Sequence, residues 1–547
     1  MKSIKIKGLA IITCFLSIAA INAQSLETTV DQLLSKKYAA GNPGAAALIA
    51  RDGKVIYRKA FGAANLELDI PMKPEHVFEL GSITKQFTSV AILMLMEQGK
   101  LDLQDDITKF IPDYPTHGKK ISIHSLLNHT SGIKSYTAME SFRELARADM
   151  SPTELIDVFK NEPMDFDPGY EYAYNNSGYI ILGHIIEVIS EMSYGDFVEE
   201  HIFKKLGMKN SYYGSMSKVI KNRASGYQPS ENGFRNAEYL SLTLPYAAGS
   251  LMSCVDDMLL WSQAIHHNTL ISEKSKQLAF TIGERLDGFP MYYGYGFSID
   301  EINDVPTIEH GGGIFGYETY GVYVPSENVY VIVLTNRNGN GPRDVTIKMA
   351  AHAIGKPFPT NASVAVSEEK MKKWVGTYEF GDGAIRYVTF KDGRLFSQRE
   401  GSENLALITV AEDAYYFEGS FTNYKFGIED GLKVAYFSSR IRKSKGLESD
   451  IKAPPAKQAV SIDASIIEKY IGTYEIQPGF TIEITTEGNQ IFGTPTGQPR
   501  SELFAENETT FFLKVVQAQV VFKTDENGVA RSLTLNQGGR EMEGKKI

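Results

Sequence analysis

The chain has 547 residues, of which 43% are hydrophobic and 22% charged, and this composition is typical of globular proteins rather than disordered or collagen-like ones. The formal net charge of −10, from 56 Lys and Arg against 66 Asp and Glu, disfavours general binding to nucleic-acid backbones. At roughly 100–200 residues per domain, we expect about three or four domains.

Residues 1–23 are typical of an export signal peptide. Three lysines open the segment, an apolar run extends from Leu9 to Ala20, and Ile-Asn-Ala ends at Ala23. The run is too short to favour a membrane-spanning helix, and no other stretch of the sequence is long and apolar enough for one. We expect cleavage after Ala23 and a periplasmic or secreted protein; an uncleaved amphipathic anchor is the alternative. Cleavage leaves Cys254 as the single cysteine, which excludes an internal disulfide and a cysteine-rich zinc site.

Local patterns predict several elements of the region that follows. Asp52-Gly53 is a strong hairpin signal between two strand-like runs, and it predicts paired strands over 46–58. Apolar side chains recur at helical spacing over 82–99, and a glycine ends that segment. The apolar run 329–334 is typical of a buried strand.

The C-terminal part of the chain contains an internal repeat. The segment Trp374–Glu379 matches Tyr470–Glu475 at an offset of 96 residues. Two copies are too few for a solenoid, so we expect two small tandem domains, and their strand-like runs predict β-barrels or sandwiches. With proline-containing linkers between them, the expected domains are 24–358, 366–452 and 461–547.

Ser82-Ile-Thr-Lys85 is the strongest local indication of a catalytic site in the sequence. On a helix, positions i and i+3 share one face, so the amine of Lys85 would lie beside the Ser82 hydroxyl. A serine is a weak nucleophile until a neighbour takes its proton, and a lysine takes it only when the lysine pKa is lowered. The N-terminus of the helix also favours a developing oxyanion. The motif alone is weak evidence for catalysis. The alternative interpretation is a serine that caps the helix beside a solvated lysine.

Further sequence blocks give this motif a context. They are Phe78-Glu-Leu-Gly-Ser82-Ile-Thr-Lys85, Gln98-Gly-Lys-Leu-Asp-Leu-Gln-Asp-Asp106, Leu126-Leu-Asn-His-Thr-Ser-Gly132, and the segment from Pro168 to Gly183 that contains Tyr174-Asn-Asn176. In this order, over about residues 40–340, they resemble the serine β-lactamase and penicillin-binding-protein superfamily, above all its class C-like, D-aminopeptidase and esterase-like branch. The resemblance implies an α+β catalytic domain, an antiparallel sheet flanked by a helical region, with two small lipocalin-like barrels after it.

The resemblance also implies roles for four residues of these blocks. Ser82 would be the acylated nucleophile, and Lys85 would be its base. Tyr174 would be a second proton carrier that needs a nearby cation, because a free tyrosine titrates at about 10. Asn176 would bind Lys85 and a substrate amide together, because its side chain both accepts and donates hydrogen bonds. The alternative for Tyr174 is a core aromatic residue.

A third family element is expected at His310-Gly-Gly-Gly313. His310 would occupy the position where the family normally offers a cation, and at neutral pH it could be neutral or charged. Gly312 would let the backbone approach the ligand, and the amides of Ser82 and Gly313 would form the oxyanion hole. One alternative is a structural turn residue at His310. Another, the oxyanion motif of lipases, is disfavoured because the sequence has no Gly-x-Ser-x-Gly.

The predicted chemistry is a two-step acyl-enzyme hydrolysis that needs no metal and no organic cofactor. We rank a peptidase or amidase on D-amino-acid-containing or other small peptides first, a carboxylesterase second and a weak β-lactamase third, because His310 stands where a lysine would bind a carboxylate. A non-turnover penicillin-binding or sensor protein is the alternative of another class. The expected partner is a small molecule or peptide and not nucleic acid, and an oligomer is left open.

Overall fold

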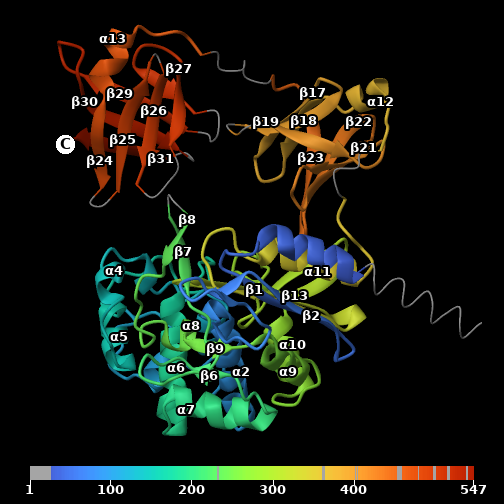
Figure 1. Ribbon diagram of the computed structural model, residues 1–547, viewed down its shortest axis with the longest axis vertical. Coiled ribbons are helices and arrows are strands. Elements are labelled where there is room, and N and C mark those ends of the chain that lie inside the picture. The colour runs from blue at the N-terminus through green and yellow to red at the C-terminus, as the bar shows by residue number, and fades with distance from the viewer. Residues whose placement is uncertain are drawn as a thin grey trace, which may run out of the picture. The chain divides into compact units, whose positions relative to one another are not determined.

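The computed structural model describes residues 26–547 except 231–232, 360–363, 401, 403, 453–458, 478–479, 489, 497–499, 514–517 and 538–539. The predicted signal peptide therefore lies outside the described residues. The chain divides into a first unit that ends at Phe358 and a second unit from Pro359 to Ile547 (Figure 1). The first unit mixes helices with antiparallel sheet and the second is built of barrels, so the predicted fold class is confirmed. No helix in the described ranges is long and apolar enough to cross a membrane.

An antiparallel sheet of six strands organises the described part of the first unit, in the order β12-β13-β14-β15-β1-β2. The N-terminal strand β1 pairs with β15, where Leu48 lies opposite Ile332. The predicted hairpin at Asp52-Gly53 is confirmed, because β1 and β2 pair across it. The strands are β1 Ala45–Arg51, β2 Lys54–Phe61, β12 Ser298–Ile302, β13 Val305–Ile314, β14 Tyr317–Val324 and β15 Val329–Thr335.

Helices cover this sheet and, together with short strands, form the rest of the described part of the first unit. Strand β15 is buried at every position, as its apolar sequence predicts, with α9 packed on β1 and β15 and α11 packed on β14 and β15. The predicted helix over 82–99 begins as the 3-10 turn η1, Gly81–Ile83, and continues as α2. After a helical segment at 26–37, the helices are α2 Thr84–Glu97, α3 Ile123–Leu127, α4 Phe142–Leu145, α5 Pro152–Phe159, α6 Asn176–Ser190, α7 Tyr194–Val198, α8 Tyr246–Gly249, α9 Val255–His266, α10 Glu273–Phe280 and α11 Arg343–Ala353.

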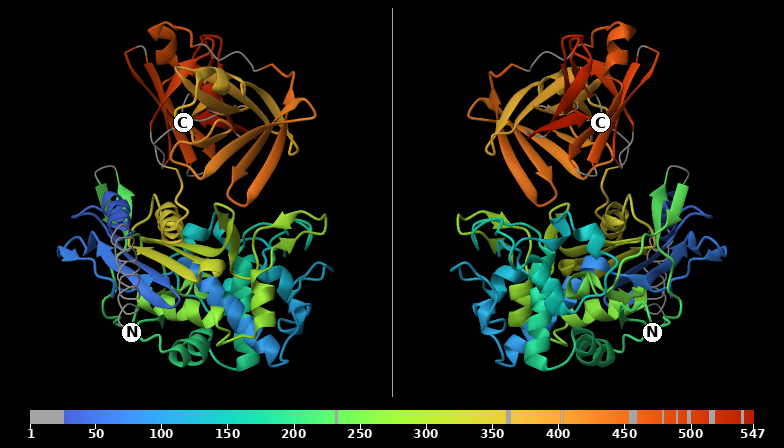
Figure 2. Two further views of the ribbon diagram at one scale, coloured as in Figure 1. Left: turned by 90° about the vertical axis from the view of Figure 1, so that its right-hand side faces the viewer. Right: turned by 90° about the vertical axis from the view of Figure 1, so that its left-hand side faces the viewer.

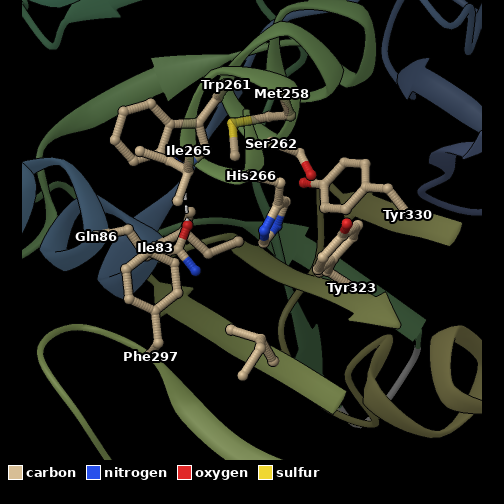
Figure 3. Close-up of a pocket in the computed structure, with 12 residues that line it drawn as sticks. Ile83, Gln86, Met258, Trp261, Ser262, Ile265, His266, Phe297, Tyr323 and Tyr330 are labelled. Atoms are coloured by element: carbon tan, nitrogen blue, oxygen red, sulfur yellow. Dashed lines mark hydrogen bonds between the residues drawn. The ribbon is translucent and has the colours of Figure 1, made fainter. Parts of the chain in front are cut away.

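Aromatic side chains fill the contact between α9, α2 and the sheet (Figure 3). Trp261 stacks on Phe87 with ring centroids 3.8 Å apart, and its Nε1 donates a hydrogen bond to Gln86 Oε1. His266 at the end of α9 stacks on Tyr323 of β14, with ring centroids 3.3 Å apart. The cavity left between these side chains measures about 20 Å³, room for about one water molecule and too small for a substrate.

Short strands bring distant segments to the start of α2. Strand β9 pairs with both β5, just before η1, and β6, while β7 and β8 form a hairpin. Another 3-10 turn, η3, spans Tyr136–Ala138. The short strands are β3 Ala63–Asn65, β4 Ile70–Pro71, β5 Phe78–Glu79, β6 Tyr212–Tyr213, β7 Tyr227–Ser230, β8 Gly233–Asn236, β9 Leu251–Ser253, β10 Gly283–Glu284 and β11 Pro290–Met291.

Two closed barrels make up the described part of the second unit, and Figure 2 shows their curved strands in orange and red. A short helix precedes each barrel, α12 Glu368–Lys372 and α13 Ala464–Ile467. The first barrel contains β16 Gly376–Phe380, β17 Ile385–Lys391, β18 Arg394–Arg399, β19 Asn404–Thr409, β20 Ala414–Phe417, β21 Thr422–Glu429, β22 Leu432–Ser439 and β23 Arg442–Ser449. The second contains β24 Gly472–Gln477, β25 Phe480–Glu487, β26 Gln490–Pro495, β27 Ser501–Ala505, β28 Thr510–Phe512, β29 Ala518–Thr524, β30 Ala530–Gln537 and β31 Arg540–Lys546.

The sequence repeat reappears in the packing of the two barrels. Trp374 stacks on Phe426 at 5.4 Å in the first barrel, and Tyr470 stacks on Phe522 at 4.4 Å in the second. Both partners are shifted by the same 96 residues. The same shift relates two buried hydrogen bonds, Tyr378 hydroxyl to the Trp374 carbonyl at 2.8 Å and Tyr474 hydroxyl to the Tyr470 carbonyl at 2.7 Å. The two segments are thus structural copies of one barrel.

Candidate active site

The site is built around the junction of η1 and α2, which carries Ser82 and Lys85. The helical spacing places Lys85 Nζ 3.1 Å from Ser82 Oγ. Lys85 is fully buried, and this burial holds the pKa of its amine well below the ordinary lysine value. A neutral amine at this position can accept the Ser82 proton, whereas a solvated lysine could not.

Two further hydrogen bonds fix the amine of Lys85. Its Nζ lies 2.8 Å from Asn176 Oδ1 and 2.9 Å from the carbonyl of Ala248 at the end of α8. Asn176 is the first residue of α6, and the Nδ2 atom of its side chain donates to Thr137 Oγ1 at 3.0 Å. The predicted contact between Asn176 and Lys85 is therefore present, and the other Nδ2 hydrogen of Asn176 is available for a substrate carbonyl.

Tyr174 closes the site opposite Lys85. Its hydroxyl lies near the Ser82 side chain, and the Lys85 Nζ lies 4.9 Å from the centre of its ring. The sequence suggested that a nearby cation would ease ionisation of Tyr174, but burial of the hydroxyl raises its pKa above the ordinary tyrosine value. Although 41% of the residue is exposed, its hydroxyl end is enclosed, so Tyr174 in the free protein is a neutral proton donor.

His310 lies on β13 and is held as a neutral imidazole. Its Nδ1 donates to the Gly311 carbonyl at 2.6 Å, and its Nε2 accepts a hydrogen bond from the Tyr293 hydroxyl at 2.9 Å. Burial, together with the nearby amine of Lys85, lowers the pKa of His310 to about 4. The sequence left open whether His310 is charged. The structure indicates a neutral side chain at neutral pH, so the site has no fixed cation at this position.

The glycines of β13 run directly beside η1. A Cβ atom on Gly312 would lie 1.9 Å from the Leu80 carbonyl oxygen, so only glycine fits at this approach. Gly81 has a φ of +54°, and a Cβ atom there would lie 2.8 Å from the Gly313 amide nitrogen. Gly313 is exposed toward open space next to Ser82. This arrangement suits the predicted oxyanion hole, whose two amides would come from adjacent backbone segments.

Two further aromatic residues support the site, and of these only His129 lies in a sequence block that indicated the site. Tyr293 holds His310, and His129 packs its ring 4.3 Å from the ring of Tyr174. His129 Nδ1 also accepts a hydrogen bond from the backbone amide of Asn175, and burial holds its pKa well below the ordinary histidine value. His129 thereby supports the segment that carries Tyr174. In the sequence, only the block Leu126–Gly132, as part of the family resemblance, indicated that His129 lies near the site.

A cavity of about 470 Å³ opens beside Ser82, a size typical of small-molecule sites. It is enclosed by η1, η3, the start of α6, the β7 strand and the β13–β14 turn. The described lining residues are Gly81, Ser82, Tyr136, Thr137, Phe142, Asn176, Gln228, Leu240, Leu244, Pro245, Ala248, Gly249, Gly313, Ile314, Phe315 and Asn338. Within the described ranges, no cluster of three or more His, Cys, Asp or Glu side chains could hold a metal ion.

Residues 27–356 match the family described as Beta-lactamase, so the chain belongs to this family. Its fold and family define a serine hydrolase. Residues 456–546 match a domain of unknown function, DUF3471. The chain is 28% identical to Penicillin-binding protein 4* of Bacillus subtilis, over 71% of this chain and 90% of that protein. It is also 28% identical to Protein flp of Staphylococcus aureus, over 58% of this chain and 63% of that protein, so it spans less than two thirds of Flp.

Solved structures show the same fold. The octameric penicillin-binding protein homologue from Pyrococcus abyssi is 26% identical with a TM-score of 0.55, over 77% of this chain and 99% of that one. The D-stereospecific amidohydrolase from a Streptomyces species is 26% identical with a TM-score of 0.52, over 60% and 99%. The D-amino acid amidase from Ochrobactrum anthropi, 21% identical with a TM-score of 0.55 over 60% and 99%, is similar in fold.

Proposed function

We propose that this protein is an exported serine amidase or peptidase that is acylated at Ser82, acting on D-amino-acid-containing or other small peptides. The observation that carries the proposal is the buried Lys85 amine, 3.1 Å from the Ser82 hydroxyl, with its pKa held low by burial. A lysine in this state serves as a general base at neutral pH. The catalytic roles assigned to the individual residues are part of this proposal.

In the acylation step, Ser82 Oγ attacks the substrate carbonyl and its proton passes to Lys85 Nζ. The amides of Ser82 and Gly313 stabilise the oxyanion. When the carbon–nitrogen bond breaks, the leaving amine takes the proton of the Tyr174 hydroxyl, and the ammonium of Lys85 restores that proton. Water then hydrolyses the acyl-enzyme by the reverse sequence of proton transfers. The neutral state of Tyr174 supports its role as donor, because burial keeps its pKa high.

Two observations favour an amide over the alternative substrates. The Streptomyces relative of known structure is a D-stereospecific amidohydrolase. In addition, the neutral His310 offers no cation to the carboxylate that penicillins carry, so a weak β-lactamase ranks third and a carboxylesterase second. An oligomer is part of the proposal because the Pyrococcus homologue is octameric.

Intact-protein mass spectrometry during incubation with D-amino-acid amides, small esters and penicillins tests this function. We expect a covalent adduct on the wild type that forms and clears with amides, and neither adduct nor turnover with Ser82→Ala. Ser262→Ala, which changes a serine on α9 outside the site, is the control and should behave like the wild type. An adduct that never clears would instead identify a penicillin-binding or sensor protein, and turnover by Ser82→Ala would contradict the proposal.

A further inference from the structure

The cavity beside Ser82 has no charged side chain among its described lining residues. Its open wall is aromatic. Tyr136 and Phe142 meet edge to face with centroids 5.9 Å apart, and Phe142 and Phe315 meet in the same way at 6.5 Å. Phe142, Phe315 and Leu240 are each only partly buried, so they present apolar surface to whatever occupies the cavity.

Several polar groups of the cavity wall already form hydrogen bonds within the protein. The Asn338 side chain accepts from the Gly316 amide at 2.6 Å and donates to two backbone carbonyls, so its amide is fully occupied. The Tyr136 hydroxyl donates to the Leu244 carbonyl at 2.9 Å. Near the nucleophile, the second Nδ2 hydrogen of Asn176 is left to bind a carbonyl oxygen. The described lining of the cavity thus offers hydrogen-bonding groups without charge, next to an apolar wall.

A charge brought into this cavity would lose hydration without gaining a partner. A free ammonium next to the scissile carbonyl would need a carboxylate, and no Asp or Glu occurs among the described lining residues. A free carboxylate would need a cation, and the neutral His310 does not supply one. Desolvation therefore discriminates against both kinds of charged group.

We propose that this cavity is the subsite for the acyl group and that it selects an uncharged aromatic or aliphatic acyl group, such as an N-acylated D-amino acid, over an acyl group with a free ammonium. Phe142, Phe315 and Leu240 are the residues that set this preference. The inference rests on the proposed function, because it assumes that Ser82 is the acylated residue. It narrows the substrate class from amides in general to amides whose acyl part is neutral.

Matched p-nitroanilides that differ in one group test the inference. N-acetyl-D-phenylalanine, 3-phenylpropanoic acid and D-phenylalanine p-nitroanilides share the ring, and only the last carries an ammonium at about pH 6.5. We expect kcat/KM for the two neutral compounds to exceed that for the charged one by at least about tenfold. Equal rates, or a preference for the ammonium compound, would overturn the inference.

Binding of the same three compounds to the Ser82→Ala protein separates this inference from the proposed function. We expect an affinity difference of at least about tenfold in favour of the neutral compounds, whether or not the wild type turns them over. Selective binding without any turnover by the wild type would contradict the amidase proposal and leave the subsite inference supported. Equal binding, or no binding of any compound up to its solubility limit, would overturn the inference.

A change of charge in the wall gives a second readout. Leu240→Asp places a carboxylate at the cavity, and we expect it to raise the ratio of charged to neutral substrate kcat/KM by at least about tenfold relative to Leu240→Asn. The asparagine variant matches its size and polarity without the charge. Phe142→Asp and Phe142→Asn form an independent pair if the first pair unfolds at lower temperature. An unchanged ratio in folded variants of both pairs would overturn the inference.

Discussion

Lys85 is a buried amine with three hydrogen-bond partners, Ser82 Oγ, Asn176 Oδ1 and the Ala248 carbonyl. Replacing it by methionine keeps an unbranched apolar stem and removes the base. We expect Lys85→Met to lower kcat/KM by about 10²–10⁴-fold, the usual contribution of a general base. Stopped-flow or steady-state assays with a neutral amide measure the loss.

Lys276→Met provides the control for this substitution. Lys276 is a largely buried lysine of α10 that bonds the His266 carbonyl and Glu273, outside the site. The Lys276→Met protein should retain the wild-type kcat/KM. Activity of Lys85→Met within a few-fold of the control would show that another group takes the Ser82 proton.

His310 should make the folded protein sensitive to acid. Its pKa is about 4 in the folded state and ordinarily about 6.5, so between these values the unfolded chain binds a proton that the folded chain does not. The free energy of unfolding should therefore fall as pH falls through this window, by up to about 3 kcal/mol. Glu79, whose pKa burial raises to about 7, acts in the opposite direction, so only a difference between variants isolates His310.

The measurement is urea unfolding of the wild type and His310→Gln between about pH 4 and 7. Glutamine keeps an acceptor for the Tyr293 hydroxyl and removes the titrating group. We expect the wild type to lose more stability than His310→Gln as pH falls. Parallel curves for the two proteins would show that His310 is not held neutral.

For individual residues, the sequence indicated Ser82, Lys85, Tyr174 and Asn176, which the structure brings together, but not every residue that holds them. The i, i+3 spacing of Ser82 and Lys85 is local, so a helix brings them together wherever it lies. Tyr293 and Thr137 reach the site from segments far away in the chain, and no local pattern marks them. The charge of His310 and the pKa of Tyr174 depend on burial, which the sequence does not reveal.

The contact between β13 and η1 is the element-level feature on which the proposed oxyanion hole depends. A methyl group on Gly312 would collide with the Leu80 carbonyl oxygen, a backbone atom that cannot rotate away, and would also lie 2.5 Å from Thr319 Oγ1. We expect Gly312→Ala to lower the free energy of unfolding by about 1–3 kcal/mol and to lower kcat/KM by displacing β13. Gly313→Ala meets nothing within 4 Å and should keep wild-type stability. Thermal unfolding of both variants is the measurement. Equal unfolding midpoints for the two variants would contradict the close approach of Gly312 to Leu80.

Local patterns also predicted several elements but, apart from the hairpin at Asp52-Gly53, not their pairing. The hairpin at Asp52-Gly53, the helix after Ser82 and the buried strand β15 follow from turn chemistry and periodicity. The pairing of β1 with β15 joins residues at opposite ends of the first unit, and the strand order depends on how the helices cover the sheet. The strand pattern alone could not distinguish a barrel from a sandwich, because both have the same alternation of residues, and only the family resemblance indicated barrels.

The buried apolar side chains described in the first unit lie between Val30 and Ala353, and each barrel has a core of its own. A chain that ends at Phe358 should therefore fold alone. We expect residues 24–358 to unfold at nearly the midpoint of the same unit in the full chain and to hydrolyse a small amide at a kcat/KM within about twofold. Calorimetry and assays on the two proteins provide the comparison.

The same truncated protein tests a role of the barrels in substrate selection. If the second unit restricts the size of substrates, removing it should raise activity on long peptides relative to small amides. An unchanged ratio would contradict that role. Failure of residues 24–358 to fold would show that the second unit stabilises the first, which the separate cores do not predict.

The shared offset of 96 residues has a consequence for the history of the gene. A closed barrel has no free edge strand. Adding or losing one whole barrel therefore exposes no unpaired backbone N–H or C=O groups that could pair with another chain. Tandem duplication by unequal crossover could therefore insert the extra module in a single event without harming the hydrolase before it. Lineages in which this enzyme ends after one module, or after three, would be equally viable.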